Sequence, residues 1–244
     1  MKSVGLIGLG YWGGILHNKL KKFCDVKFTC RSKDTYLDKL DGVDWVVVST
    51  PNDTHYEIVE NCLISHKNVF CEKPLTLTYS QSKKLYRMAE IEGVKLYVDD
   101  VQNYRDYDFK ISEYNMVERK KGGGGNMQSV LYMLAYHDIY ILYEHIKNLD
   151  IQDVVLIDSK SKLHFKIKFN KMTIEFLYDI NSLKKEHFIN GRSVAGEDDI
   201  LSKMLRGVFG EEADFKYNKK ISLFTNRLID VLNDKLFKKA QKSL

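Results

Sequence analysis

Three closely spaced glycines lie near the N-terminus. Gly8, Gly10 and Gly13 form the pattern G-x-G-x-x-G. They follow the strand-like run Val4–Leu9 and precede the helix-like segment Leu16–Phe23. In this context the first glycine permits a tight turn, the second lets a pyrophosphate approach the backbone, and the third allows close packing of helix on strand. The helix N-terminus adds free N–H groups for phosphate. The motif therefore predicts a dinucleotide site, and the alternative is an ordinary strand–helix turn.

The end of the next strand bears on which dinucleotide is bound. A carboxylate about 20 residues after the glycines commonly binds the ribose 2′-hydroxyl of NAD. The strand Val26–Cys30 is followed instead by Arg31 and Ser32. Both side chains suit a 2′-phosphate, and Arg31 can also stack on adenine. The sequence favours NADP(H) over NAD(H), and the alternative for Arg31 is a solvent-facing loop residue.

Strand-like and helix-like segments alternate through the first hundred residues. Thr54 with Glu57, and Thr78 with Gln81, have the spacing of capping boxes that open two helices. This alternation predicts an α/β Rossmann domain with a doubly wound parallel sheet. The predicted strands are Val4–Leu9, Val26–Cys30, Val43–Ser49, Val69–Cys71 and Val94–Val98.

The character of the sequence changes after residue 101. A polar, tyrosine-rich stretch and the glycine run Gly122–Gly125 predict a mobile loop. A helix is expected over Val130–Ile146. Apolar and polar residues then alternate over Leu163–Phe169 and in the strand that follows, as in a sheet with one solvent-exposed face. We expect a Rossmann domain over residues 1–101 and a smaller α+β domain, with a mainly antiparallel open sheet, over residues 102–244.

Composition excludes several functional classes. The chain has 244 residues and a net charge of +5, with 38 basic and 33 acidic side chains mixed along it. This pattern predicts solvated helix faces rather than a nucleic-acid-binding stripe. The four cysteines form no metal-binding or redox pair and are expected to be buried free thiols. With no apolar run of about 18 residues and no leader-like N-terminus, we expect a cytoplasmic protein without a membrane span or bound metal.

Two further motifs follow the third and fourth predicted strands. They are Thr50-Pro51-Asn52-Asp53-Thr54-His55 and Cys71-Glu72-Lys73-Pro74. Together with the glycines, in this order and spacing, they resemble the Gfo/Idh/MocA oxidoreductase family over residues 1–105. Leu134–Ile139 resembles the helix that carries the family's catalytic histidine. The relatives most similar in this stretch are sugar-nucleotide dehydrogenases.

The resemblance implies NAD(P)-linked oxidation or reduction of a sugar or polyol. We expect a nucleotide-linked sugar of surface-polysaccharide synthesis as substrate, and a homo-oligomer, dimer or tetramer. Lys73 would lie near the nicotinamide and the reacting hydroxyl. His137 would exchange the proton, since an imidazole titrates near neutrality. Pro74 is expected to follow a cis peptide bond, as in relatives.

The remaining site residues are predicted in two sets. Cofactor contacts are expected from Gly8, Gly10, Tyr11, Trp12, Gly13, Arg31, Ser32, Thr50, Pro51, Asn52, His55, Glu72, Lys73 and Pro74. Substrate contacts are expected from Gln102, Tyr104, Arg105, Tyr136 and Asp138. Arg105 would suit a diphosphate. Structural roles remain open for several of them: a local role for His55, a domain linker around Gln102, and a core aromatic at Tyr136.

Two features depart from the family pattern. Met133 stands where members often carry an aspartate one helical turn before the histidine. Members also usually exceed 300 residues, so the C-terminal domain is reduced here. One alternative is therefore a non-catalytic dinucleotide-binding module that acts through a protein partner. Another is an enzyme whose site is completed by a neighbouring subunit.

Overall fold

The computed structural model describes residues 1–31, 34–122, 126–196 and 199–238. Its contacts divide the chain into two compact units, Met1–Tyr104 with Asp199–Arg227, and Arg105–Asp198 with Leu228–Leu244. The predicted division at residue 101 assigned all of residues 199–227 to the second domain. In the structure these residues pack on the first unit, because their apolar side chains cover one face of its sheet.

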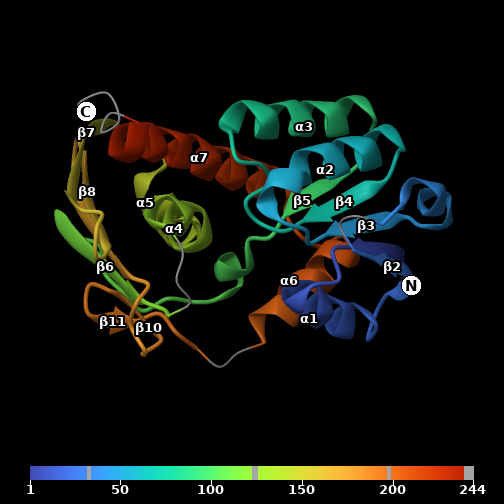
Figure 1. The fold of residues 1–244 in the computed structure, drawn as a ribbon, viewed down its shortest axis with the longest axis horizontal. Helices are drawn as coiled ribbons and strands as arrows, with labels where there is room; N and C mark the ends of the chain where they lie inside the picture. Colours follow the sequence, from blue (N-terminus) through green and yellow to red (C-terminus); the bar gives the residue numbers. More distant parts are fainter. Residues whose placement is uncertain (32–33, 123–125, 197–198, 239–244) are drawn as a thin grey trace. The chain divides into compact units, whose positions relative to one another are not determined.

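The first unit is built on a five-stranded parallel sheet, as predicted (Figure 1). The strand order β2-β1-β3-β4-β5 reverses direction between β1 and β3, which is the switch point where such sheets bind ligands. All four residues of β3 are buried, which explains its continuous apolar sequence. The strands are β1 (Ser3–Ile7), β2 (Asp25–Cys30), β3 (Trp45–Val48), β4 (Asn68–Cys71) and β5 (Leu96–Val98).

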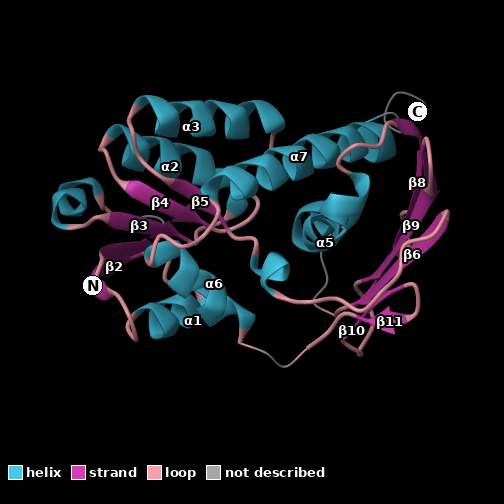
Figure 2. Ribbon diagram, turned by 180° about the vertical axis from the view of Figure 1, so that it is seen from behind, coloured by secondary structure: helices cyan, strands magenta, loops and turns pink. Residues whose placement is uncertain are grey.

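Helices cover both faces of this sheet (Figure 2). One core cluster joins the sheet to α2 and α3, and the other joins it to α1 and α6. The polypeptide thus returns to its first unit after completing most of the second. The helices are α1 (Tyr11–Leu20), α2 (His55–Ile64), α3 (Tyr79–Ile91), α6 (Ile200–Phe209) and α7 (Phe215–Asn233), with short 3-10 turns at Leu37–Gly42, Asn52–Thr54 and Val101–Tyr104.

One of the two predicted helix caps is confirmed. The Thr78 hydroxyl accepts a hydrogen bond from the backbone N–H of Gln81 at the start of α3, over 3.4 Å. The predicted cap by Thr54 is wrong. Its Oγ1 lies 2.7 Å from both the Thr50 hydroxyl and the Pro51 carbonyl oxygen, inside the 3-10 turn that precedes α2. The hydroxyl therefore closes the turn and does not cap the helix.

A buried asparagine on α7 pairs with the edge strand of the first sheet. Asn218 Oδ1 accepts from the Val98 N–H over 3.0 Å, and its Nδ2 donates to the Val98 carbonyl over 2.8 Å. This amide satisfies the two backbone groups that the outermost strand would otherwise leave unpaired. Eight residues further, Asn226 donates to the Thr76 carbonyl over 3.0 Å. Two buried amide side chains of α7 are thus paired with backbone groups of the first unit.

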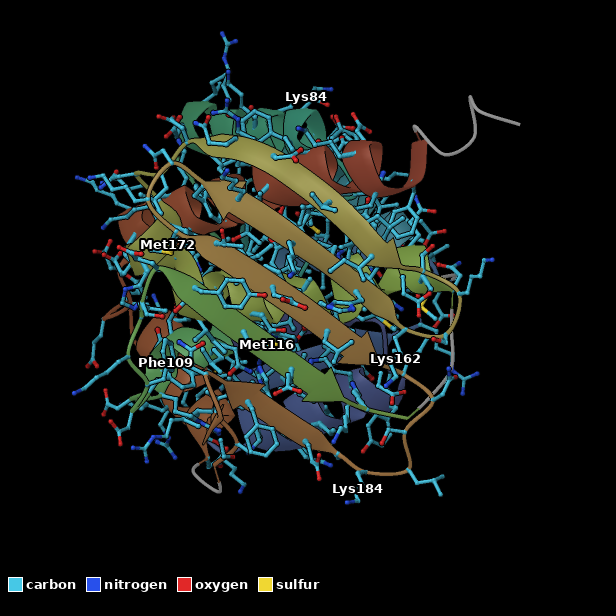
Figure 3. The ribbon with its side chains drawn as sticks, turned by 90° about the vertical axis from the view of Figure 1, so that its left-hand side faces the viewer. Lys84, Phe109, Met116, Lys162, Met172 and Lys184 are labelled. Atoms are coloured by element: carbon cyan, nitrogen blue, oxygen red, sulfur yellow. The ribbon has the colours of Figure 1, made fainter. Side chains whose placement is uncertain are left out.

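The second unit contains a mainly antiparallel six-stranded sheet, as predicted. Its order is β11-β10-β6-β9-β8-β7, in which β6 and β9 run parallel and the other neighbours run antiparallel. Figure 3 views these strands face on, with Met116 of β6 labelled. The strands are β6 (Tyr114–Lys120), β7 (Ile151–Asp158), β8 (Leu163–Phe169), β9 (Thr173–Asp179), β10 (Glu186–Ile189) and β11 (Arg192–Ser193).

A bent helical segment lies beside this sheet (Figure 2). It consists of α4 (Met127–Val130), a π-helical turn (Leu131–Ala135) and α5 (Tyr136–Ile146), so the predicted helix over Val130–Ile146 is confirmed. π-Helical turns are rare and are often found at functional sites. This one ends directly before the segment that carries His137. Of the predicted glycine loop, residues 123–125 lie outside the described residues.

Candidate functional site

The three glycines of the N-terminal turn have different surroundings. A Cβ on Gly8, whose φ is +106°, would lie 2.4 Å from the Ser49 carbonyl oxygen. A Cβ on Gly13 would lie 2.0 Å from the Gly8 carbonyl oxygen. A Cβ on Gly10 would have nothing within 4 Å. The protein's own packing thus requires glycine at positions 8 and 13, while Gly10 leaves open the space where a diphosphate would approach the backbone.

The helix that follows presents an uncapped N-terminus. Gly10 is the N-cap residue of α1, no side chain bonds to the first turn, and the first turn carries no acid. Tyr11 is 89% exposed, so its ring does not shield this end. An uncapped helix N-terminus whose first turn carries no acid suits a phosphate group. The geometry of this turn therefore fits a dinucleotide.

The turn after β2 contains an acid that the sequence analysis overlooked. Arg31 is exposed, and its backbone N–H donates to Asp34 Oδ2 over 2.6 Å. Asp34 follows the glycines at about the spacing of a ribose-binding carboxylate. Its spacing from the glycines is a sequence signal, although Asp34 lies beyond the last residues of the strand. Ser32, the other predicted phosphate contact, lies outside the described residues.

His55 joins the two motif loops that follow β3 and β4. It is fully buried, with Nδ1 2.8 Å from the Pro74 carbonyl oxygen and Nε2 2.8 Å from the Thr50 carbonyl oxygen. Burial lowers the pKa of this imidazole. These contacts favour the structural alternative over a direct cofactor contact. The Lys73–Pro74 peptide bond is cis, as the resemblance implied.

The carboxyl group of Glu72 is also engaged within the protein. It is 8% exposed and accepts a hydrogen bond from the Trp12 indole N–H on α1. It is further hydrogen-bonded to Asp99, which the sequence analysis did not select. Lys73, the next residue, is half-buried at the carboxyl end of β4. The glycine turn and the Glu-Lys-Pro loop are thereby linked.

The residues after β5 are held largely by other protein groups. The Tyr104 hydroxyl lies 3.0 Å from the Tyr97 hydroxyl, which donates to Asp100 Oδ1 over 2.8 Å. Arg105, in the second unit, donates through Nη1 to the Val194 carbonyl over 3.0 Å and through Nη2 to the Gly196 carbonyl over 3.2 Å. These contacts favour a structural role for both residues. Gln102 is half-buried in the intervening 3-10 turn.

Asp138 occupies the interior of the second unit. It is fully buried, with Oδ1 3.3 Å from Arg119 and 2.7 Å from His187 Nε2, and Oδ2 accepts from the Tyr178 hydroxyl over 2.9 Å. Although burial opposes ionisation, the contacts with Arg119, His187 and Tyr178 hold the pKa of Asp138 below its usual value. Its predicted contact with substrate is not supported, because both oxygens are used by the protein.

The neighbours of Asp138 on the helix differ in exposure. Tyr136 is fully buried, which favours the core alternative. His137 is half-buried, and Met133 is 38% exposed. The buried Asp138 anchors this helix and so sets which way the adjacent His137 faces.

Other chemical features can be stated briefly. All four cysteines are free and buried, as expected. Within the described residues, no group of three or more His, Cys, Asp or Glu side chains is placed to hold a metal ion. None of the described helices has the length and apolarity to span a membrane.

Comparison with known proteins agrees with the geometry of the first unit. Residues 14–100 match the model of an oxidoreductase family with an NAD-binding Rossmann fold. The first unit is thus an NAD-binding Rossmann domain of the oxidoreductase class. More particularly, the matched residues are similar to the Gfo/Idh/MocA family, which the sequence motifs also resemble.

Individual relatives match over parts of the chain. An uncharacterized oxidoreductase of Schizosaccharomyces pombe is 42% identical over 79 residues, which are 31% of this chain and 21% of the relative. The scyllo-inositol 2-dehydrogenase (NADP(+)) IolW of Bacillus subtilis is 30% identical over 115 residues, 39% of this chain and 32% of the relative. The matched segments thus span only a fifth to a third of these curated relatives.

Solved structures extend the likeness to the whole fold. The UDP-N-acetylglucosamine 3-dehydrogenase GnnA from Acidithiobacillus ferrooxidans superposes with a TM-score of 0.80 and 14% identity, over 96% of this chain and 97% of that chain. At this identity the likeness concerns the fold alone. The likeness of fold therefore extends over the second unit as well.

Proposed function

We propose that this protein is an NAD(P)-dependent oxidoreductase that acts on a CH–OH group of a sugar. The observation that carries the proposal is the glycine turn, in which Gly10 faces open space at an uncapped helix N-terminus. A turn built only for folding has no need of glycine at that position. The family of the first unit supports hydride chemistry at such a site.

A nucleotide-linked sugar is the substrate class that we favour, in the synthesis of surface polysaccharide. Two proteins of similar fold support this choice. One is the UDP-N-acetylglucosamine 3-dehydrogenase, and the other is the WlbA dehydrogenase of Thermus thermophilus, whose structure is a complex with NAD and UDP-GlcNAcA. A direct test is to incubate the purified protein with a panel of nucleotide sugars and free polyols and to follow nicotinamide absorbance. If the protein turned over free polyols and no nucleotide sugar, the proposal of a nucleotide-linked substrate would be wrong.

Lys73 and His137 are the residues proposed to handle the proton. A nicotinamide held at this site would supply the hydride chemistry, and the protein must move a proton to or from the substrate oxygen. A lysine ammonium stabilises negative charge that develops on that oxygen, and a histidine can accept or return the proton. Lys73→Met and His137→Asn should each lower turnover by about a hundredfold or more, with dinucleotide binding retained. Unchanged turnover in both variants would remove these assignments.

NADP(H) is proposed as the preferred cofactor, with Arg31 as the contact for the 2′-phosphate. Asp34 lies in the same turn and would favour NAD(H) instead, because a carboxylate repels the 2′-phosphate and accepts a hydrogen bond from a ribose hydroxyl. The experiment compares NADPH and NADH binding by nicotinamide fluorescence. We expect tighter NADPH binding, weakened about tenfold or more by Arg31→Leu. Tighter NADH binding that is lost in Asp34→Asn would reverse the preference.

A non-catalytic module is the second candidate, and Met133 is the observation that favours it. This exposed methionine stands where the family often carries an aspartate. A module of this kind would bind the dinucleotide and turn over no sugar, and its output would depend on a protein partner. Turnover of any sugar excludes it. A homo-oligomer, dimer or tetramer, is expected in either case, and light scattering of the purified protein tests this.

A further inference from the structure

Two buried carboxyl groups meet at the carboxyl ends of neighbouring strands. In the sheet Cys71 of β4 pairs with Val98 of β5, so the next residues, Glu72 and Asp99, leave the strands side by side. The Asp99 N–H donates to the Cys71 carbonyl over 2.9 Å, which continues the ladder. Glu72 is 8% exposed and Asp99 2% exposed, and their side chains are hydrogen-bonded to each other.

A hydrogen bond between two carboxyl groups requires one proton. The other contacts of the pair are compatible with a single shared proton. Glu72 Oε1 accepts from the Trp12 indole N–H, and Asp99 Oδ1 accepts from the Val101 N–H over 2.8 Å. With one proton shared between the two carboxyl groups, every donor in this chain of hydrogen bonds has an acceptor. The chain runs from the first turn of α1 to the loop after β5.

The surroundings of the pair keep this proton in place at neutral pH. Burial, reinforced by the charge of Asp99, raises the pKa of Glu72 well above its usual value, and burial also raises that of Asp99. The neighbouring Lys73 ammonium acts in the opposite direction on both. Burial raises the pKa of the Cys71 thiol well above its usual value, and the pKa of Asp100 is raised to about 6, so neither group is expected to change its charge just above neutrality.

We propose that Asp99 is a positioning residue of the dinucleotide site, which acts through the single proton it shares with Glu72 to hold Trp12 at the start of α1. This inference rests on the proposed function, because Trp12 belongs to the turn assigned to the dinucleotide. Loss of the shared proton places two carboxylates against each other in a buried site, where their repulsion is costly. The pair should then separate, release the indole and loosen the turn.

The first test observes the indole without any ligand. The chain has only two tryptophans, so a protein with 15N-labelled tryptophan gives two indole signals, and Trp12→Phe assigns them. We expect the Trp12 signal to shift in one step as the pH is raised above neutrality. In Asp99→Asn the new amide donates to an ionised Glu72 and still accepts from Val101, so no shared proton remains and the step should vanish. A signal that does not shift in the unmodified protein, or a step that persists in Asp99→Asn, would overturn the proposal.

Asp100→Asn is the matched control. Asp100 lies in the same loop and is equally buried, but it bonds to Tyr97 and Asn103 and not to Glu72. The alkaline step should therefore persist in Asp100→Asn. If this variant also lost the step, the effect would belong to the loop and not to the carboxyl pair, and the proposal would fail.

The second test measures dinucleotide affinity over the same pH range. NADH is the probe, because it lacks a titrating 2′-phosphate. Its affinity should fall about fivefold or more across the step in the unmodified protein and in Asp100→Asn, and less than about twofold in Asp99→Asn. An equal fall in Asp99→Asn would assign the effect to Lys73 instead and overturn the proposal. If neither NADH nor NADPH binds at neutral pH, the proposed function fails, while the indole signal still decides whether the pair holds Trp12.

Discussion

At the scale of single residues, the open space beside Gly10 distinguishes function from folding. The turn contains three glycines, and a Cβ would collide with the backbone at two of them. Only Gly10 is glycine without a steric reason from the protein itself. Its φ of −92° is also accessible to any residue. A matched pair of alanine substitutions can therefore separate binding from stability.

We expect Gly10→Ala to leave stability nearly unchanged and to weaken dinucleotide binding about tenfold or more, because the added methyl group occupies the approach of the diphosphate. Gly13→Ala should instead lower the free energy of unfolding by about 1–3 kcal/mol, since its methyl group collides with the Gly8 carbonyl. Urea denaturation and fluorescence titration measure the two effects. Equal affinity of Gly10→Ala and the unmodified protein would contradict the assignment of this turn.

Asp138 is a second residue with a specific pH prediction. Its folded-state pKa is held below the unfolded value of about 3.9, so its ion pairs stabilise the protein fully above that value. This contribution is lost as the pH falls through the folded-state pKa. Asp138→Asn should therefore lower the free energy of unfolding at pH 7 by about 2–4 kcal/mol. The difference from the unmodified protein should shrink below about pH 4. A difference that is independent of pH in urea denaturation would contradict this.

At the scale of elements, α7 completes the first sheet as well as covering it. Asn218 occupies the place of a missing sixth strand by pairing with both backbone groups of Val98. The helix therefore carries a buried polar contact among apolar residues. This explains how a sheet of five short strands ends against a helix without leaving its edge open.

Replacing Asn218 should be costly for this reason. Asn218→Leu leaves a buried N–H and a buried carbonyl of Val98 without partners, and we expect a loss of about 2–4 kcal/mol in the free energy of unfolding. Lys219→Ala is the control on the same helix, because its ion pair with Glu90 is at the surface and contributes less than about 1 kcal/mol. Thermal denaturation compares the two variants. Similar losses in both would show that Asn218 does not complete the sheet.

At the scale of the whole molecule, the first unit is assembled from two separated parts of the chain. Residues 199–227 supply α6 and most of α7 to a sheet formed by residues 1–104. Five large apolar side chains of α6 are buried there: Leu201, Met204, Leu205, Val208 and Phe209. At about 1.5–3 kcal/mol each, their burial is comparable with the entire stability of a typical domain.

A fragment that ends at residue 104 should therefore not fold by itself. We expect it to unfold without a cooperative transition, because the part of its sheet that α6 covers is exposed. Joining residues 199–233 to it through a flexible linker restores that cover and should restore a cooperative transition. Circular dichroism with heating distinguishes the two constructions. Cooperative unfolding of the short fragment would contradict the division into units.

The sequence by itself determined the class of the first unit and much of its site. The glycine spacing, the alternation of strands and helices, and the order of the three motifs are local patterns, and each depends on residues near one another in the chain. Local sterics and periodicity are enough to read them. The antiparallel character of the second sheet was predicted for the same reason.

Only the tertiary structure decided which polar residues are buried and with what partners. Asp99 and Asp138 look like ordinary acids in the sequence, and Asn218 looks like a helix-surface residue. Their roles come from Glu72, Arg119 and Val98, which lie between 19 and 120 positions away along the chain. The energy of a buried polar group depends on the partner that satisfies it. Sequence periodicity records whether a position faces inward, but it carries no information about which distant group the position will meet.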